Sequence, residues 1–203
     1  MIRLALALTL AFTGVAQAKT QKAVLAGGCF WCVESNFEGE PGVKDVISGY
    51  TGGASQNPTY DNHEGHYEAV QITFDDSKIS YAEVVAKFLR STDVIDAGGQ
   101  FCDRGNAYRS AIFPLDAAQK QAAQDEVARA EAELGQKIVT PVLAAKTFWP
   151  AEAYHQDYYK SGDVVLTRRG PKSKASAYKF YRESCGRDAR VSELWGSAAE
   201  YLH

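Results

Sequence analysis

The spacing of apolar and polar residues predicts strands and helices that alternate along the chain. Short runs that are apolar or alternate with period two predict strands, and apolar residues three or four apart predict amphipathic helices. The predicted strands cover residues 22–26, 43–50, 68–74, 108–113 and 138–145. The predicted helices cover residues 29–40, 81–89 and 116–134 and a further segment that starts at Pro150. This order predicts a single α/β domain with a mixed β-sheet and helices packed on it.

Two helix ends carry local signals that support these boundaries. Ser80 is followed three residues later by Glu83, a capping box that satisfies free backbone N–H groups in the first turn of a helix. Gly135 follows the long alanine-rich helix, where glycine commonly closes the last turn. Both signals agree with the apolar spacing.

Composition narrows the class of protein. The chain has 203 residues, of which 45% are hydrophobic and 23% charged, with a formal net charge of −3. These fractions are typical of a folded globular domain. The slightly acidic charge argues against nucleic-acid binding, which uses a basic face. The chain has four cysteines, and its single methionine is Met1.

Residues 1–18 have the pattern of a secretory signal peptide. Arg3 precedes a largely apolar run over residues 4–12, and Ala16 and Ala18 supply the small residues for cleavage after Ala18. The apolar run is too short to span a bilayer comfortably. We therefore expect an exported, periplasmic protein with no membrane association, in which disulfides can form.

The segment from Gly27 to Cys32 places a cysteine where a predicted strand meets a predicted helix. Free N–H groups and the dipole at a helix N-terminus favour a thiolate, so we expect a lowered pKa for Cys29. The glycines permit a sharp turn that keeps the sulfur accessible. Cys32 lies one turn further along, where it can pair with an oxidised Cys29; a half-buried structural bridge is the alternative. We favour redox chemistry.

Other polar residues could assist such a cysteine. Glu68 shares one strand face with apolar residues, and burial there raises a carboxyl pKa so that the group can act as a general acid. Tyr60 and Tyr108 offer hydroxyl donors, although an isolated tyrosine is more often an ordinary surface aromatic.

His63 and His66 leave a metal site open as an alternative. Together with Cys29 and Cys32 they supply the four ligands of a zinc site. The interval between the two pairs is longer than in zinc fingers, and the aromatic residues between the cysteines suit an apolar pocket better. We therefore expect no metal.

Several motifs taken together resemble peptide methionine sulfoxide reductase A, and the resemblance runs in order over residues 24–159. The motifs are GCFW at 28–31, GYTGG at 49–53, NPTY at 57–60, GHYEAV at 65–70, YRSAI at 108–112, PAE at 150–152 and YHQ at 154–156. The chain is similar to an exported member with the sequence GCFWC. The combination of GCFW with GHxEAV is far more specific than a lone C-x-x-C.

The resemblance implies a fold, an activity and a set of roles. It implies a two-layer α/β sandwich, with residues 19–167 as the catalytic domain and 168–203 as a C-terminal extension packed on it. It implies thiol-dependent reduction of methionine S-sulfoxide, free or in proteins, which repairs oxidised proteins. The implied roles are Cys29 as nucleophile, Glu68 as general acid, Tyr60, Tyr108 and Asp103 as polar partners, and Phe30 and Trp31 as the pocket for the methyl group.

The resemblance leaves open which cysteine regenerates Cys29, because many family members have Gly where this chain has Cys32. Those members use a cysteine in the C-terminal tail, and this chain also has Cys185 and Cys102. We expect Cys32 to resolve Cys29, with Cys185 as the next choice. Cys102 and Cys185 could instead form a second pair, structural or acting as a relay. We expect a monomer without a bound cofactor, reduced by a thioredoxin-like protein or a dithiol.

Two other functions fit parts of the pattern. A thioredoxin-like protein disulfide oxidoreductase would use the C-x-x-C motif but would not need Glu68. An exported binding domain, held together by disulfides or zinc, would use the cysteines only as structure.

Overall fold

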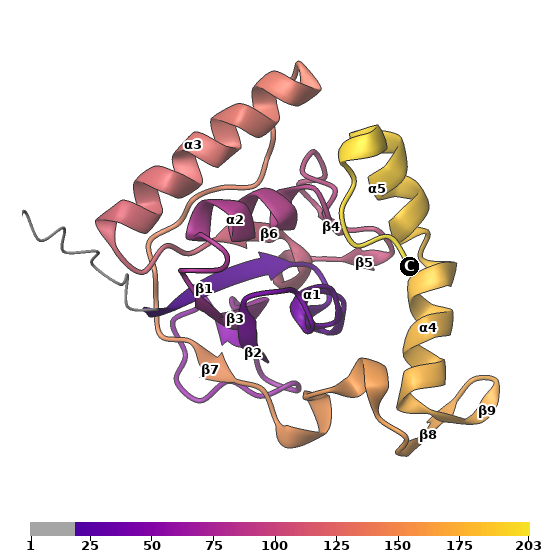
Figure 1. The fold of residues 1–203 in the computed structure, drawn as a ribbon. Helices are drawn as coiled ribbons and strands as arrows, with labels where there is room; N and C mark the ends of the chain where they lie inside the picture. The colour runs from indigo at the N-terminus through magenta and orange to yellow at the C-terminus, as the bar shows by residue number, and fades with distance from the viewer. Residues whose placement is uncertain (1–18) are drawn as a thin grey trace, which may run out of the picture.

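A five-stranded sheet forms the centre of the computed structural model, which describes residues 19–203 (Figure 1). The strands, in spatial order, are β6 (Ser110–Ile112), β1 (Thr20–Gly27), β3 (Tyr67–Asp75), β2 (Val43–Thr51) and β7 (Trp149–Pro150). These neighbours pair antiparallel, and a parallel bridge joins Ile112 to Val142. The prediction of an α/β domain is confirmed, whereas the predicted signal peptide lies outside the described residues.

Three helices build the main apolar layer. They are α1 (Phe30–Phe37), α2 (Tyr81–Leu89) and α3 (Ala117–Leu134). The first two pack on the sheet, and α3 packs against α2 (Figure 1). Phe37, Ile72 and Phe88 are fully buried between these layers. The opposite sheet face carries a smaller cluster, which Leu143 and Phe148 partly cover.

The predicted helix ends are confirmed. The Ser80 side chain accepts a hydrogen bond from the Glu83 backbone N–H at 3.2 Å, and Glu83 accepts one from the Ser80 backbone N–H at 2.8 Å. Gly135 ends α3 with φ 65°, a left-handed conformation that glycine adopts without strain.

Two predicted elements are wrong. Residues 138–145 do not form a strand, because Pro141 has no N–H to donate and the pairing is limited to the bridge at Val142. No helix begins at Pro150. This residue ends β7, after which the Ala151 N–H donates to the Ser48 carbonyl at 2.8 Å and holds the chain along the sheet. Two short 3₁₀ turns follow, at Ala153–His155 and Tyr158–Lys160.

The segment predicted as a strand at 108–113 begins later than expected. A 3₁₀ turn at Asn106–Tyr108 precedes β6. Before it, the short strands β4 (Gly99–Gln100) and β5 (Asp103–Arg104) form a hairpin. This arrangement brings the loop of residues 101–108 to the end of the sheet where α1 starts (Figure 1).

The tail folds back beside α1. It contains the hairpin of β8 (Val164–Thr167) and β9 (Gly170–Ser173), then α4 (Lys174–Ser184) and α5 (Arg187–Trp195), and ends in a 3₁₀ turn, Gly196–Ala198. Trp195 is buried and its Nε1 donates to the Thr92 carbonyl at 3.1 Å. Among residues 19–203, no helix combines the length and apolar character needed to cross a membrane.

Candidate active site

The turn between β1 and α1 fixes the position of Cys29. Gly28 has φ +83°, and a Cβ there would lie 2.6 Å from the Cβ of Gln100. A larger residue would therefore be strained and would clash. Cys29 is the N-cap residue of α1, and its carbonyl accepts a hydrogen bond from the Cys32 N–H at 3.0 Å. Cys29 and Cys32 are 6% and 1% exposed.

A small cavity of about 120 Å³ opens at Cys29. Its lining contains every residue that the sequence predicted for catalysis or for the substrate pocket, and one residue, Tyr181, that the sequence did not suggest. The lining residues are Cys29, Phe30, Trp31, Tyr60, Glu68, Asp103, Tyr108 and Tyr181. Five separate segments of the chain therefore meet around this cavity.

Glu68 is a buried acid at the start of β3. It is 2% exposed, and its Oε2 accepts a hydrogen bond from the Phe30 N–H at 3.0 Å. Burial raises the pKa of Glu68 to about 8, against the lowering effect of that hydrogen bond. The carboxyl is therefore mostly protonated at neutral pH and can donate a proton into the cavity.

The two buried thiols have different pKa values. A hydrogen bond from Cys29 lowers the pKa of Cys32 to about 6, with help from the positive charge of Arg187. Burial raises the pKa of Cys29, and the negative charge of Cys32 adds to the rise. The expected lowering at Cys29 is thus not found, because desolvation and neighbouring negative charge outweigh the helix N-terminus. Cys32 is therefore the more acidic thiol of the pair.

Three tyrosines, Tyr60, Tyr108 and Tyr181, also line the cavity. Burial raises the pKa of Tyr60 and of Tyr108, so both hydroxyls stay protonated and can donate hydrogen bonds. Tyr181 of α4 donates a hydrogen bond to Asp103. Burial raises the pKa of Asp103, while the bond from Tyr181 opposes the rise. The tail therefore contributes directly to this site.

Aromatic rings hold the apolar wall. Trp31 stacks on Tyr158, with ring centroids 3.8 Å apart. His155 lies 5.1 Å from Phe30 and 4.6 Å from Tyr60, measured between ring centroids. Burial lowers the pKa of His155 to about 4, so this ring is neutral at pH 7. A neutral wall suits an uncharged substrate group.

Glu152 positions the loop that carries Tyr60. Its carboxylate accepts hydrogen bonds from the Tyr60 backbone N–H at 2.9 Å and from the Tyr50 hydroxyl at 3.2 Å. Glu152 lies in one of the sequence motifs, but the sequence does not predict this contact. The Tyr60 ring thereby stays at the mouth of the cavity.

The other two cysteines form a disulfide at the rim. Cys102 and Cys185 are bonded, with Cα atoms 5.1 Å apart and a sequence separation of 83 positions. Cys102 is exposed and Cys185 half-buried. Cys102 precedes Asp103, and Cys185 follows Tyr181 by one helical turn. The bond therefore ties α4 to the loop that lines the cavity.

Arg187 connects the last long helix to the catalytic turn. Arg187 is 2% exposed, and its guanidinium donates to the carbonyls of Gly27 and Ser91, each at 3.1 Å. It also lies over the Phe101 ring, 4.2 Å from the centroid. Its charge stabilises the Cys32 thiolate.

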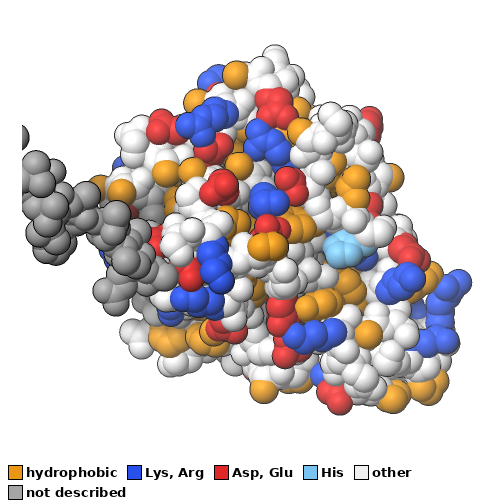
Figure 2. Space-filling view, viewed as in Figure 1, with side chains coloured by type: hydrophobic (Ala, Val, Ile, Leu, Met, Phe, Trp, Pro, Cys, Tyr) orange, Lys and Arg blue, Asp and Glu red, His pale blue; other side chains and the backbone are white. Residues whose placement is uncertain are grey.

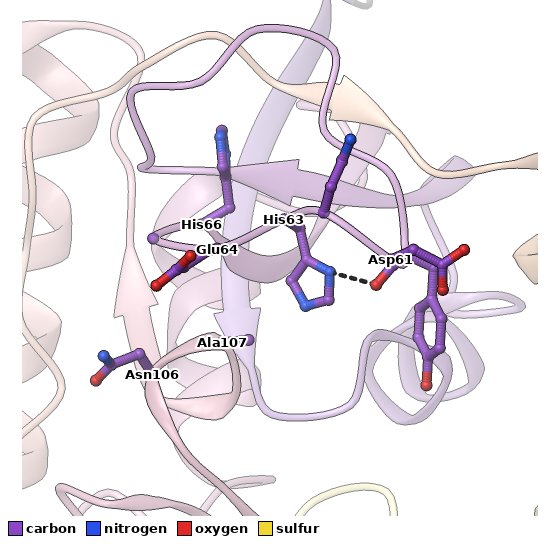
Figure 3. A pocket seen from close by; sticks show the side chains of 9 residues that line it. Asp61, His63, Glu64, His66, Asn106 and Ala107 are labelled. Atoms are coloured by element: carbon purple, nitrogen blue, oxygen red, sulfur yellow. Dashed lines mark hydrogen bonds between the residues drawn. The ribbon is translucent and has the colours of Figure 1, made fainter.

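A wider hollow of about 510 Å³ lies beside Tyr60 and holds His63 and His66 (Figure 3). His63 Nδ1 is 2.8 Å from the Tyr60 carbonyl, and His66 Nε2 is 3.0 Å from the Ser55 hydroxyl. Among residues 19–203, these histidines do not join the two buried cysteines in a set of metal ligands. The arrangement gives the zinc alternative no support.

Comparison with known proteins identifies the family. The family model described as peptide methionine sulfoxide reductase matches residues 21–187. The chain belongs to this family. It is 50% identical over 184 residues to peptide methionine sulfoxide reductase MsrA 2 of Rhizobium meliloti (strain 1021), covering 90% of this chain and 87% of the relative. It is 43% identical over 186 residues to the MsrA 2 protein of Caulobacter vibrioides, covering 90% and 89%.

Solved structures of the family share the fold. Methionine sulfoxide reductase A of Corynebacterium diphtheriae has a TM-score of 0.64 and 30% identity, covering 70% of this chain and 75% of that chain. Mxr1 from Saccharomyces cerevisiae in reduced form has a TM-score of 0.65 and 27% identity, covering 69% and 84%. The protein is thus an oxidoreductase that reduces methionine sulfoxide by thiol chemistry.

Tyr181 is the lining residue that sequence reasoning missed. It lies beyond the motifs that carried the resemblance, in a tail whose contacts were unknown. Its spacing from Cys185 was the available signal, because residues four apart share one face of a helix. Once Cys185 is placed near the site, Tyr181 must lie there too.

Proposed function

We propose that this methionine sulfoxide reductase acts on the S epimer, free or within proteins, with Cys29 as nucleophile and Glu68 as general acid. The observation that carries the proposal is the cavity in which both side chains meet beside Phe30 and Trp31. An apolar wall suits the methyl group on the substrate sulfur, and a buried protonated carboxyl suits its oxygen. Separate enzymes reduce the two epimers of methionine sulfoxide. The assignment of the S epimer to this protein rests on its family resemblance.

The first step needs a thiolate on Cys29. Transfer of the Cys29 proton to the Cys32 thiolate supplies it, because the two sulfur atoms share a hydrogen bond. Cys29 then attacks the sulfoxide sulfur while Glu68 gives its proton to the oxygen. Tyr60 and Tyr108 donate hydrogen bonds to that oxygen as its negative charge grows.

The products of this step balance in atoms and electrons. The oxygen, now carrying the proton of Glu68, moves from the substrate sulfur to the Cys29 sulfur, and the bond formed between the two sulfur atoms by the attack breaks, which leaves Cys29 as a sulfenic acid. The substrate sulfur is reduced to a thioether, Cys29 is oxidised by two electrons, and Glu68 remains as a carboxylate. Cys32 then attacks the sulfenic sulfur, water leaves, and a Cys29–Cys32 disulfide forms.

Regeneration passes the oxidation outward. In their reduced form, Cys102 and Cys185 exchange with the inner disulfide, which restores Cys29 and Cys32 as thiols and leaves Cys102–Cys185 oxidised. The described state, with the outer pair bonded and the inner pair free, fits the end of this exchange. A thioredoxin-like protein or a small dithiol then reduces the exposed outer bond, so no bound cofactor is needed.

An activity assay tests the main proposal. With dithiothreitol as reductant, the protein should convert methionine S-sulfoxide to methionine and leave the R epimer unchanged. Cys29→Ser should abolish turnover. Reduction of protein disulfides without reduction of the sulfoxide would instead favour a disulfide oxidoreductase and overturn the proposal.

Disulfide mapping tests the role of Cys32. The fully reduced protein is given one equivalent of substrate, alkylated at successive times and digested. We expect a Cys29–Cys32 bond first and a Cys102–Cys185 bond later. A Cys29–Cys185 bond with Cys32 free would show that the tail cysteine resolves Cys29.

We further propose that the enzyme is exported to the periplasm and works as a monomer. The pattern of residues 1–18 supports export, and a self-contained cavity supports a monomer. Intact mass of the protein from the periplasmic fraction should match cleavage after Ala18. Light scattering should give the mass of one chain.

A further inference from the structure

The hairpin β8–β9 and the start of α4 form a basic surface on an acidic protein. Residues 164–182 contain no Asp or Glu, although the whole chain has a net charge of −3. The cations in this stretch are Arg168, Arg169, Lys172, Lys174, Lys179 and Arg182. Lys174 and Arg182 are buried against carboxylates, whereas Arg168, Arg169 and Lys172 are exposed. Figure 2 shows Lys and Arg side chains gathered over this corner of the molecule.

The same surface exposes large apolar side chains. Leu166 is 85% exposed, Val164 is 71% exposed and Phe180 is 46% exposed. Leu166 pairs with Pro171 across the hairpin, so both lie on one face of the two strands. A contiguous patch of exposed apolar side chains usually marks a site where another molecule binds and buries it. The hairpin therefore has the apolar centre and charged rim of a protein interface.

A groove of about 510 Å³ runs between the hairpin and α4. Arg168, Arg169, Lys172 and Phe180 line it, and the lining contains no carboxylate. Arg169 lies over the Phe180 ring, 4.3 Å from its centroid, which holds the groove wall in place. The positive charge of the groove favours a partner with an acidic surface, and the Phe180 ring favours an apolar side chain on that surface.

The groove shares α4 with the accessible disulfide, which points to the reductant as the partner. Tyr181 lines the catalytic cavity and its neighbour Phe180 lines the groove, so the groove adjoins the site on this helix. Cys185, half of the accessible disulfide, caps the C-terminal end of the same helix. With 11 residues, α4 is about 16 Å long. A partner that buries about 800 Å² of this surface can cover both the groove and the disulfide.

We infer that the groove between β8–β9 and α4 is the docking surface for the protein reductant, a dithiol protein with an acidic surface next to its reactive cysteines. This inference rests on the proposed reduction of Cys102–Cys185 by an external dithiol. The basic groove steers the reductant to the disulfide, where its thiolate attacks one sulfur and the other leaves as a thiolate. Two electrons pass from the reductant to the enzyme.

The test compares two reductants. The variant Arg168→Glu/Arg169→Glu and the control variant Lys120→Glu/Lys137→Glu carry the same charge change. Lys120 and Lys137 are exposed on and just beyond α3, on the opposite side of the molecule from the hairpin β8–β9 (Figure 1). Turnover is measured with dithiothreitol and with thioredoxin kept reduced by its NADPH-dependent reductase.

The groove variant should raise the KM for thioredoxin about tenfold at low ionic strength, because rim charges mainly control association. Added salt should raise the KM of the wild type and of the control variant, and should have little effect on the KM of the groove variant. With dithiothreitol, all three proteins should turn over within about twofold of one another, since a small neutral dithiol needs no steering.

The possible outcomes distinguish a failure of the proposed docking surface from a failure of the proposed reductase activity. An unchanged KM for thioredoxin in the groove variant would refute the docking surface and leave the reductase activity intact. No dithiothreitol-driven turnover by the wild type would refute the proposed function itself. Sedimentation with vesicles of anionic phospholipid checks another occupant. The inference would be overturned if the wild type bound these vesicles, the groove variant did not, and the KM for thioredoxin were the same for both proteins. The surface would then be a membrane-binding site.

Discussion

The proton on Glu68 gives the sharpest test of the mechanism. Burial raises the pKa of Glu68 to about 8, so the acid form dominates at neutral pH and is lost above that value. At pH 9 only about a tenth of the molecules keep the proton, and the rate of the chemical step should fall about tenfold for each further pH unit. Below about pH 6 the rate should also fall, because the pKa of Cys32 is about 6 and the thiolate of the pair is lost. The profile should be bell-shaped.

The substitution Glu68→Gln removes the proton and keeps an oxygen that can accept the hydrogen bond from the Phe30 N–H. General acid catalysis contributes about 10²–10⁴ in rate, so kcat should fall by about that factor. This loss corresponds to about 3–5 kcal/mol of transition-state stabilisation. The fall in rate near pH 8 should disappear, because no carboxyl in the cavity at that position remains to titrate.

The measurement is a single-turnover rate with methionine S-sulfoxide from about pH 5 to about pH 10, since single turnover isolates the chemical step from regeneration. Glu34→Gln is the matched control. Burial raises the pKa of Glu34 to about 7, but this residue bonds Ser48 and the Asp157 N–H and does not line the cavity. The control should keep the bell shape. If Glu68→Gln retained the fall near pH 8, Glu68 would not be the acid.

Three further predictions concern stability and catalytic efficiency. Glu68 has a pKa of about 8 in the folded protein, above its ordinary value, so it stabilises the fold most at low pH; the free energy of unfolding should fall as pH rises towards 8, and Glu68→Gln should flatten this slope in urea titrations. Cys102→Ser/Cys185→Ser opens a loop of 83 residues and should cost about 4–5 kcal/mol of stability in the absence of reductant, a loss that dithiothreitol should reproduce in the wild type. Tyr181→Phe removes the hydrogen bond to Asp103 and should lower kcat/KM about tenfold. Tyr201→Phe, which removes a bond to the distant Glu40, should leave kcat/KM unchanged, and equal effects of the two tyrosine variants would argue against a role for Tyr181 in the site.

Local signals predicted the parts of the fold that depend on neighbouring residues. The capping box at Ser80 and the closing glycine at Gly135 each involve groups within one helical turn, and the structure has both. The segment after Pro150 was predicted wrongly because long-range contacts decide it. The Gln156 side chain bonds the backbone of Ser48, 108 residues away, and holds this segment against the sheet instead of in a helix.

In the candidate site, too, features that depend on neighbouring residues could be predicted, and features that depend on long-range contacts could not. Cys29 was singled out because the turn, the glycines and the helix start are adjacent in sequence. The direction of its pKa shift was wrong, because desolvation and the charge of Cys32 depend on the assembled cavity. Tyr181 and Arg187 come from the tail, and no local pattern says which part of the domain a tail will cover. Their contribution needed the three-dimensional structure.

The hydrogen bond between Arg187 and the Gly27 carbonyl affects when the site is completed during synthesis of the chain. These residues are 160 positions apart, and the guanidinium closes over the turn next to Cys29. At about 5–20 residues per second, synthesis leaves this turn waiting roughly 10–30 s for its partner. The turn next to Cys29 therefore lacks this contact until almost the whole chain has been made. A truncated chain would carry Cys29 and Glu68, the proposed nucleophile and acid, and still lack the closed cavity in which they can cooperate.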